Sequence, residues 1–198
     1  LVRKETVTIG NTDWAVSGDS ATGSSEWIVY DIDNLDYIGL HPGTNVVPPK
    51  PNLFFSEYIE GSSNNKALEI YNANGSDVDL STLRVIRANN GAVALSDSLV
   101  LSGTLVAGDV FVIGNSSAVQ GILDVSDITS TLTYFNGDDF MGLQYNNSGV
   151  WETIDAIGLF GEDPGAGWKV AGVVDATANH TLVRKETVTI GNTDWAVS

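Results

Sequence analysis

One segment of seventeen residues occurs twice in this chain. Residues 1–17 read LVRKETVTIGNTDWAVS, and residues 182–198 have the same sequence. Neither chance nor divergence between related domains produces such a match. The identity therefore indicates a periodic polypeptide, seen over slightly more than one period. Residues 1–181 are then the repeating unit, and Leu182 begins the next copy.

Two other interpretations of the repeat stay open. In one, the chain has this length, and its identical ends are one element offered twice, such as a strand that each subunit both keeps and lends to a neighbour. In the other, the duplication is an artificial choice in how the chain was put together and has no biological meaning. The residues expected to take part in assembly are common to both copies: Leu1, Val2, Arg3 and Trp14 in the first, and Leu182, Val183, Arg184 and Trp195 in the second.

Charge and cysteine content narrow the classes of function. The net charge is −16, which repels nucleic-acid phosphates and disfavours direct binding of nucleic acid. The same acidity attracts divalent cations, or it serves solubility in salty or extracellular surroundings. The chain has no cysteine, so it forms neither disulfides nor thiolate metal sites. No apolar run in the sequence reaches the length of a membrane span.

Short apolar runs separated by Gly, Asn and Asp predict an all-β fold. The main predicted strands are 53–60, 67–71, 83–87, 110–113, 140–145 and 150–159. Residues 136–139, Asn-Gly-Asp-Asp, predict a hairpin between strands 131–135 and 140–145. The only predicted helical turn lies within residues 118–129. The regular spacing of strands and turns favours a β-sandwich.

A proline-rich stretch sets the predicted domain boundary. Residues 42–51 contain Pro42, Pro48, Pro49 and Pro51, which cannot join a central sheet and favour an extended, semi-rigid linker. Residues 1–41 are then the C-terminal strands of the preceding repeat. Residues 52–198 are a β-sandwich that lacks its last strands. Strands 26–31 and 36–40 are expected to pack either on a neighbouring copy or back on their own chain.

Three stretches together resemble the lamin tail domain family. They are FFSEYIEGSSNNKALEIYNANGSDVDLSTLRV (54–85), FNGDDFMGL (135–143), and TLVRKETVTIGNTDW (181–195) continued through the repeat by SEWIVYDIDNLDYIGLH (25–41). The resemblance implies an immunoglobulin-like antiparallel β-sandwich. It also implies an accessory and interaction module of the kind found in secreted bacterial nucleases and large surface proteins. The family has no catalytic motif to carry over.

The residues themselves make no case for an enzyme. His41 and His180 have no metal-binding spacing, and the sequence contains no nucleophile elbow or phosphate-binding glycine loop. The paired carboxylates fall in predicted turns, where Asp is common for structural reasons.

Two features are candidate binding sites. Asp31, Asp33 and Asp36 are the best calcium candidate, because Ca²⁺ takes hard oxygen ligands, although their spacing departs from an EF-hand. Calcium is the only cofactor that the sequence suggests. Trp168 follows a glycine-rich loop, and its exposure would mark it as a ligand contact.

Repetition is the strongest clue to function. We expect a structural repeat unit of an extracellular bacterial filament, fibre or giant surface protein, assembled head to tail with copies of itself. The alternative is an adhesin-like or nuclease-accessory module that binds a surface glycan or a protein.

Overall fold

The computed structural model describes residues 1–21, 23–35, 38 and 50–195. The chain divides into two compact units, Leu1–Pro49 and Lys50–Ser198. The division falls inside the predicted linker, of which Lys50 and Pro51 are described and lead into the first strand of the second unit. The other linker prolines, Pro42, Pro48 and Pro49, lie outside the described residues.

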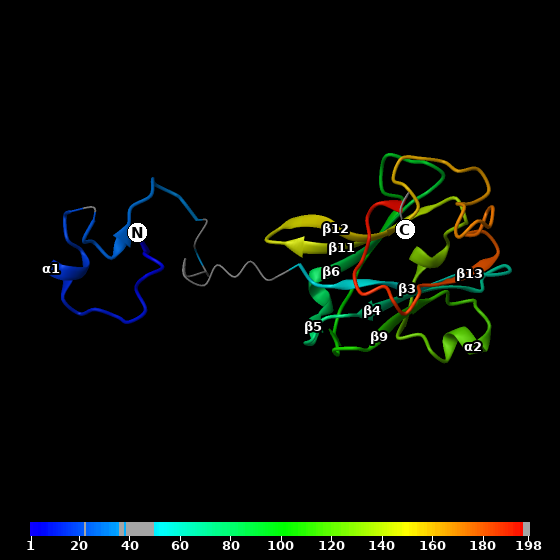
Figure 1. The fold of residues 1–198 in the computed structure, drawn as a ribbon, viewed down its shortest axis with the longest axis horizontal. Coiled ribbons are helices and arrows are strands. Elements are labelled where there is room, and N and C mark those ends of the chain that lie inside the picture. Colours follow the sequence, from blue (N-terminus) through cyan, green and yellow to red (C-terminus); the bar gives the residue numbers. More distant parts are fainter. Residues whose placement is uncertain (22, 36–37, 39–49, 196–198) are drawn as a thin grey trace. The chain divides into compact units, whose positions relative to one another are not determined.

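The second unit consists of two main sheets (Figure 1). The five-stranded sheet has the order β10-β9-β4-β3-β13, formed by β10 (Ile128–Thr129), β9 (Val110–Gly114), β4 (Lys66–Asn72), β3 (Leu53–Glu60) and β13 (His180–Val183). The four-stranded sheet has the order β12-β11-β6-β7, formed by β12 (Val150–Ile157), β11 (Phe140–Asn147), β6 (Leu83–Ala88) and β7 (Asp97–Val100). A short pair joins β5 (Val78–Asp79) to β8 (Thr104–Leu105).

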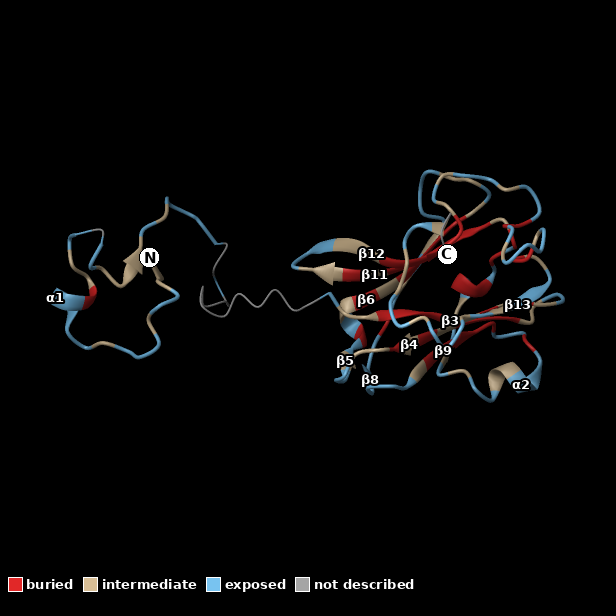
Figure 2. Cartoon of the chain, in the orientation of Figure 1, coloured by how far each residue is buried: buried red, intermediate tan, exposed pale blue. Residues whose placement is uncertain are grey.

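Apolar side chains from both sheets form the core of this unit. Successive side chains of a strand point to opposite faces, so one set from each strand is buried. Leu68 and Ile70 of β4 and Leu143 of β11 are fully buried in one cluster. Figure 2 shows the buried residues along the strands and the exposed ones in the turns. Apart from the parallel pair β9 and β10, the described strand pairs are antiparallel. The predicted all-β antiparallel sandwich is confirmed.

The predicted hairpin around residues 136–139 is wrong. Residues Thr131–Thr133 form a 3-10 turn, η3, capped by Ser130, and the Arg87 guanidinium donates to the carbonyls of Thr131 and Leu132. These carbonyls therefore bind a side chain instead of a partner strand. β11 pairs with β6 and β12. The helical turn expected within 118–129 is one turn, α2 (Gln120–Leu123).

The first unit has little regular structure of its own. It contains β1 (Val2–Arg3), paired antiparallel with β2 (Trp27–Ile28), and one helical turn, α1 (Trp14–Ser17). β2 is shorter than the predicted strand 26–31, because within this unit it has no second neighbouring strand among the described residues. Ser17 is the only buried residue in the described part of the unit. Its large apolar side chains are mostly exposed, among them Ile9, Trp14 and Val29.

Candidate functional site

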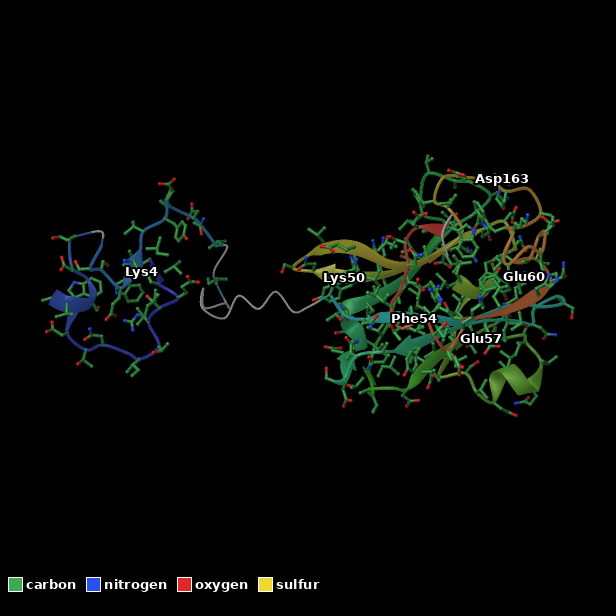
Figure 3. All side chains as sticks on the ribbon, viewed as in Figure 1. Lys4, Lys50, Phe54, Glu57, Glu60 and Asp163 are labelled. Atoms are coloured by element: carbon green, nitrogen blue, oxygen red, sulfur yellow. The ribbon has the colours of Figure 1, made fainter. Side chains whose placement is uncertain are left out.

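The candidate site is the place on the second unit where the second copy of the repeated segment binds. β13 begins just before this copy and pairs antiparallel with the edge of β3, in the register Leu182 to Tyr58 and Val183 to Glu57. The backbone N–H of Arg184 continues the ladder and donates to the carbonyl of Ser56 at 2.8 Å. Figure 3 labels Glu57 and Glu60 on β3, the strand to which β13 is added. We call residues 182–195, in this position, the docked segment.

Asp155 of β12 anchors the docked segment to both sheets. Its side chain is fully buried, and its carboxylate accepts hydrogen bonds from three directions. The donors are the backbone N–H of Phe55 on β3 at 2.8 Å, the backbone N–H of Asn192 at 2.7 Å and the guanidinium of Arg184 at 3.0 Å. Two of the three belong to the repeated sequence. The carboxylate therefore joins the docked segment to one strand of each sheet, β3 and β12.

Backbone contacts hold the rest of the docked segment close to the sandwich. The Asn192 carbonyl accepts from Ala156 N–H at 3.1 Å, and the Asn52 side chain donates to the Thr189 carbonyl at 2.6 Å. A Cβ atom added at Gly191 would lie 2.5 Å from the carbonyl oxygen of Ile154. Glycine is thus required for this close approach. Figure 1 shows the docked segment, in red, running from β13 across the side of the sandwich.

Trp195 ends the docked segment against the core. Its ring packs edge-to-face on Trp168 with a centroid distance of 6.4 Å, and it contacts the main apolar cluster. A cavity of about 640 Å³ remains beside it, lined by β3 residues and by the docked segment. The residues of the docked segment that line it are Leu182, Val183, Arg184, Lys185, Val188, Ile190, Gly191, Asn192 and Trp195. The described part of the sandwich therefore leaves a partly open cavity on this side.

The first copy has different partners in the first unit. Arg3 lies 3.8 Å from the Glu26 carboxylate and stacks over the Trp27 ring at 4.5 Å. Trp14, which corresponds to Trp195, packs on Trp27 with a centroid distance of 6.3 Å and is 62% exposed. A Cβ atom at Gly10, the counterpart of Gly191, would meet nothing within 4 Å.

Local structure is nevertheless the same in the two copies. The turn Val7 N–H to Lys4 carbonyl recurs as Val188 to Lys185, at 3.0 and 2.9 Å. The Asn11 side chain accepts from Asp13 N–H at 2.9 Å, and Asn192 accepts from Asp194 N–H at 2.8 Å. Short-range sequence thus sets the same turns twice, while the long-range partners differ.

Burial raises the pKa of the Asp155 carboxyl above its ordinary 3.8, although Arg184 and the three backbone N–H groups at Asn192, Phe55 and Ala156 act in the opposite direction. Because the folded state then holds this proton more tightly than the unfolded state, the free energy of unfolding falls as pH rises above 3.8 and levels off once the folded pKa is passed. We expect Asp155→Asn to remove part of this slope. Urea unfolding from about pH 4 to about pH 7 measures it. An unchanged slope would show that Asp155 does not titrate differently on unfolding.

The other predicted site residues are not brought together in the described structure. Asp31 and Asp33 are exposed, and Asp36 lies outside the described residues, so the calcium site stays a prediction. The described residues contain no group of three or more His, Cys, Asp or Glu side chains suited to a metal ion. Trp168 is only 8% exposed, and its ring packs on Trp195. It therefore offers no open face to a ligand.

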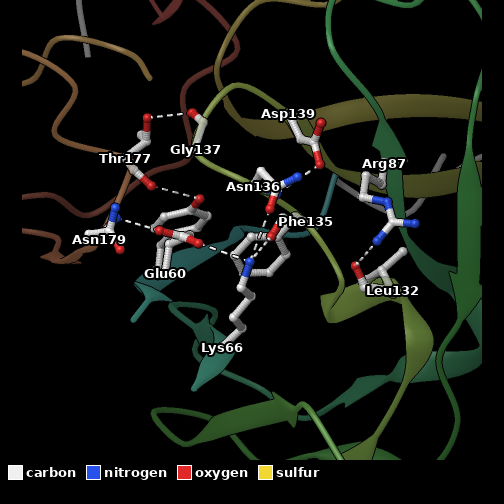
Figure 4. A network of polar contacts seen from close by, with 11 residues as sticks. Glu60, Lys66, Arg87, Leu132, Phe135, Asn136, Gly137, Asp139, Thr177 and Asn179 are labelled. Atoms are coloured by element: carbon white, nitrogen blue, oxygen red, sulfur yellow. Dashed lines mark hydrogen bonds and ion pairs between the residues drawn. The ribbon is translucent and has the colours of Figure 1, made fainter. Parts of the chain in front are cut away.

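A buried polar network was missed at the sequence level (Figure 4). The Lys66 ammonium lies 2.9 Å from the Glu60 carboxylate, and both side chains are 9% exposed. Lys66 also donates to Asn136 Oδ1 at 3.2 Å, while Glu60 accepts from the backbone N–H of Asn179, just before β13. The only available signal was a charge at the adjoining ends of two apolar strands, with Glu60 ending β3 and Lys66 beginning β4. Asp155 gave a similar signal, a single acid at an inward position of β12.

Comparison with known proteins places the sandwich in a family. A family model described as the lamin tail domain matches residues 47–163. The match includes the first two resembling stretches and ends before β13 and the docked segment. Curated proteins include no match to this chain. Among the described residues, no helix has the length and apolar character needed to cross a membrane.

Proposed function

The chain belongs to the lamin tail domain family, and from this premise we propose that it is a structural repeat unit joined head to tail with copies of itself. The match and the two facing sheets support an immunoglobulin-like module in the second unit. The proposal goes further and assigns it to an extracellular bacterial filament, fibre or giant surface protein. The observation that carries the proposal is the docked segment. The sandwich has a shaped binding position for residues 182–195, and the chain offers the same sequence again at its other end.

Head-to-tail joining follows from the position of the two copies. One copy is bound by the sandwich, whereas the other precedes the sandwich in the chain and pairs with β2 in the first unit. A contact between two different surfaces of identical units repeats without closing when its rotation is not cyclic, and it then forms an open fibre. β13 covers the edge of β3 and itself becomes the edge strand of the five-stranded sheet, where a further strand can pair.

The matched glycines give a direct test. Gly191→Ala places a Cβ atom 2.5 Å from a backbone oxygen, whereas Gly10→Ala meets nothing within 4 Å in its own unit. In the Gly191→Ala chain we expect the second copy to leave its position and the first copy of another chain, which keeps Gly10, to bind there. Sedimentation velocity should then show a concentration-dependent series of oligomers.

The double variant is the control for this experiment. With Gly10→Ala and Gly191→Ala together, neither copy can bind the sandwich, so the series of oligomers should disappear. Gly10→Ala alone should sediment as the unmodified chain does. A Gly191→Ala chain that stays monomeric at its highest soluble concentration would contradict the proposal. Oligomers that persist in the double variant would show that association does not use this position.

A separate measurement decides how the units are linked. After boiling in strong denaturant, native material made of separate subunits should have a mass near 21.0 kDa. A covalent tandem array should have a mass many times larger. No particular observation favours the alternative of a glycan-binding or protein-binding module, since Trp168 is buried.

A further inference from the structure

We propose that the outer edge of β13 and the cavity beside it bind the Trp27 strand of another copy of this sequence. The inference rests on the proposed function and deepens it, because it names the strand of another copy that pairs with the docked segment. It rests on a comparison of the two copies, which share their sequence and their local turns but pair with different strands.

The two pairings use opposite edges of the repeated segment. In the second unit, Arg184 N–H points to β3 and bonds to Ser56. In the first unit, Lys4 N–H points to β2 and bonds to the Glu26 carbonyl. Along an antiparallel strand, neighbouring residues direct their backbone groups to opposite sides. Lys185, the counterpart of Lys4, therefore directs its backbone groups away from β3, and so does Val183.

The two pairings are consequently compatible. One copy of the segment can bond to a β3 strand on one edge and to a β2 strand on the other. Applied to the second unit, the register of the first unit places Ile28 beside Val183 and Trp27 beside Arg184. The five-stranded sheet would then gain a sixth strand next to β13.

Side-chain direction puts Trp27 at the cavity. Leu182 packs on the core and Arg184 reaches Asp155, so these two alternate residues face the inside of the sandwich. A residue paired with Arg184 lies on the same face, as the stacking of Arg3 over Trp27 shows in the first unit. Arg184 and Trp195 both line the cavity. Their counterparts, Arg3 and Trp14, both contact the Trp27 ring in the first unit.

Exposed apolar surface supports the same occupant. Val29 is 78% exposed in the first unit, and its position two residues after Trp27 gives it the same face of the strand. Cavities of this size with mainly apolar walls take up several side chains or a small ligand. A copy of β2 with Trp27 and Val29 would bury apolar surface in the cavity and complete the sandwich.

The experiment uses the full chain with a second copy of residues 18–35 appended after Ser198, the order in which a periodic sequence continues. We expect the amides of Val183 and Lys185 to exchange with solvent roughly tenfold or more slowly, since an amide within a strand ladder exchanges only when the ladder opens. The Arg184 amide, already bonded to Ser56, should change much less. Unchanged exchange at Val183 and Lys185 would overturn the inference.

Trp27→Ala in the appended copy tests the cavity, and the same substitution at the original Trp27 is its matched control. Only the appended variant should lose the protection. If the protection survives it, the strand pairs without placing Trp27 in the cavity, and that part of the inference is wrong.

The pairing occurs within one chain, so it does not depend on association. If the amides of the extended chain are protected but the Gly191→Ala chain stays monomeric, head-to-tail joining is refuted and this inference stands. If the Gly191→Ala chain forms oligomers but the amides are not protected, this inference is refuted and head-to-tail joining stands.

Discussion

Replacing Arg184 with alanine is expected to lower the free energy of unfolding of the second unit by about 3–5 kcal/mol, the usual cost of breaking a buried ion pair. Asp155 is fully buried, and Arg184 is 16% exposed at the side chain. Without the guanidinium, the carboxylate keeps its backbone N–H donors but has no compensating charge. Urea unfolding followed by tryptophan fluorescence measures the loss.

Arg3→Ala is the matched control, because it removes the same residue from the other copy. Arg3 lies 3.8 Å from Glu26, beyond hydrogen-bond distance, and Glu26 is 20% exposed at the side chain whereas Asp155 is fully buried. We therefore expect Arg3→Ala to cost about 1 kcal/mol or less. The Arg184→Ala loss should also shrink at acid pH, where the raised pKa of Asp155 lets its carboxyl take up a proton. Equal losses from the two substitutions would mean that the docked segment is not anchored at Asp155.

Replacing Lys66 with alanine is expected to cost a similar amount, about 3–5 kcal/mol. The substitution leaves the buried Glu60 carboxylate without its cation and removes the donor to Asn136. Because Glu60 also accepts from the backbone of Asn179, the start of β13 should loosen with it. Urea unfolding measures the total loss in the free energy of unfolding, and faster hydrogen exchange at β13 would show that this strand is loosened.

A double variant separates the ion pair from its hydrogen bonds. Glu60→Gln with Lys66→Met leaves no buried charge unpaired, and a side chain at position 60 can still accept from Asn179. We expect most of the lost stability to return, since well-packed neutral replacements of a buried pair are often neutral. Lys50→Ala, at an exposed lysine, should change stability by less than about 0.5 kcal/mol. A double variant as unstable as Lys66→Ala alone would show that packing, not charge, explains the effect.

The long strands were readable from the sequence because their alternation is local. Residues 53–60 were predicted as a strand, and β3 has these bounds; β4, β6, β9, β11 and β12 lie within a few residues of their predictions. Residues 131–135 misled the prediction, since their alternation is strand-like but the Arg87 side chain takes their carbonyls. That partner is more than 40 positions away in the sequence, and no local pattern reveals it.

The candidate site shows the same division between local and non-local information. The sequence identified the repeated segment and, within it, the residues expected to take part in assembly, Arg184 and Trp195 among them. It did not identify Asp155 as their anchor, because the strand also contains Glu152 and an acid in a largely apolar strand is compatible with several structural roles. It also could not place Trp168 and Trp195 against each other.

The two identical segments separate the features that local sequence determines from those that long-range contacts determine. Sequence alone determined that the segment repeats, which turns it forms and which residues share a face, since these follow from neighbours a few positions apart. Only the tertiary structure decided that one copy binds Asp155 through Arg184 while the other stacks Arg3 on Trp27. Identical residues have identical local preferences, but the groups that bury and pair them come from distant parts of the chain.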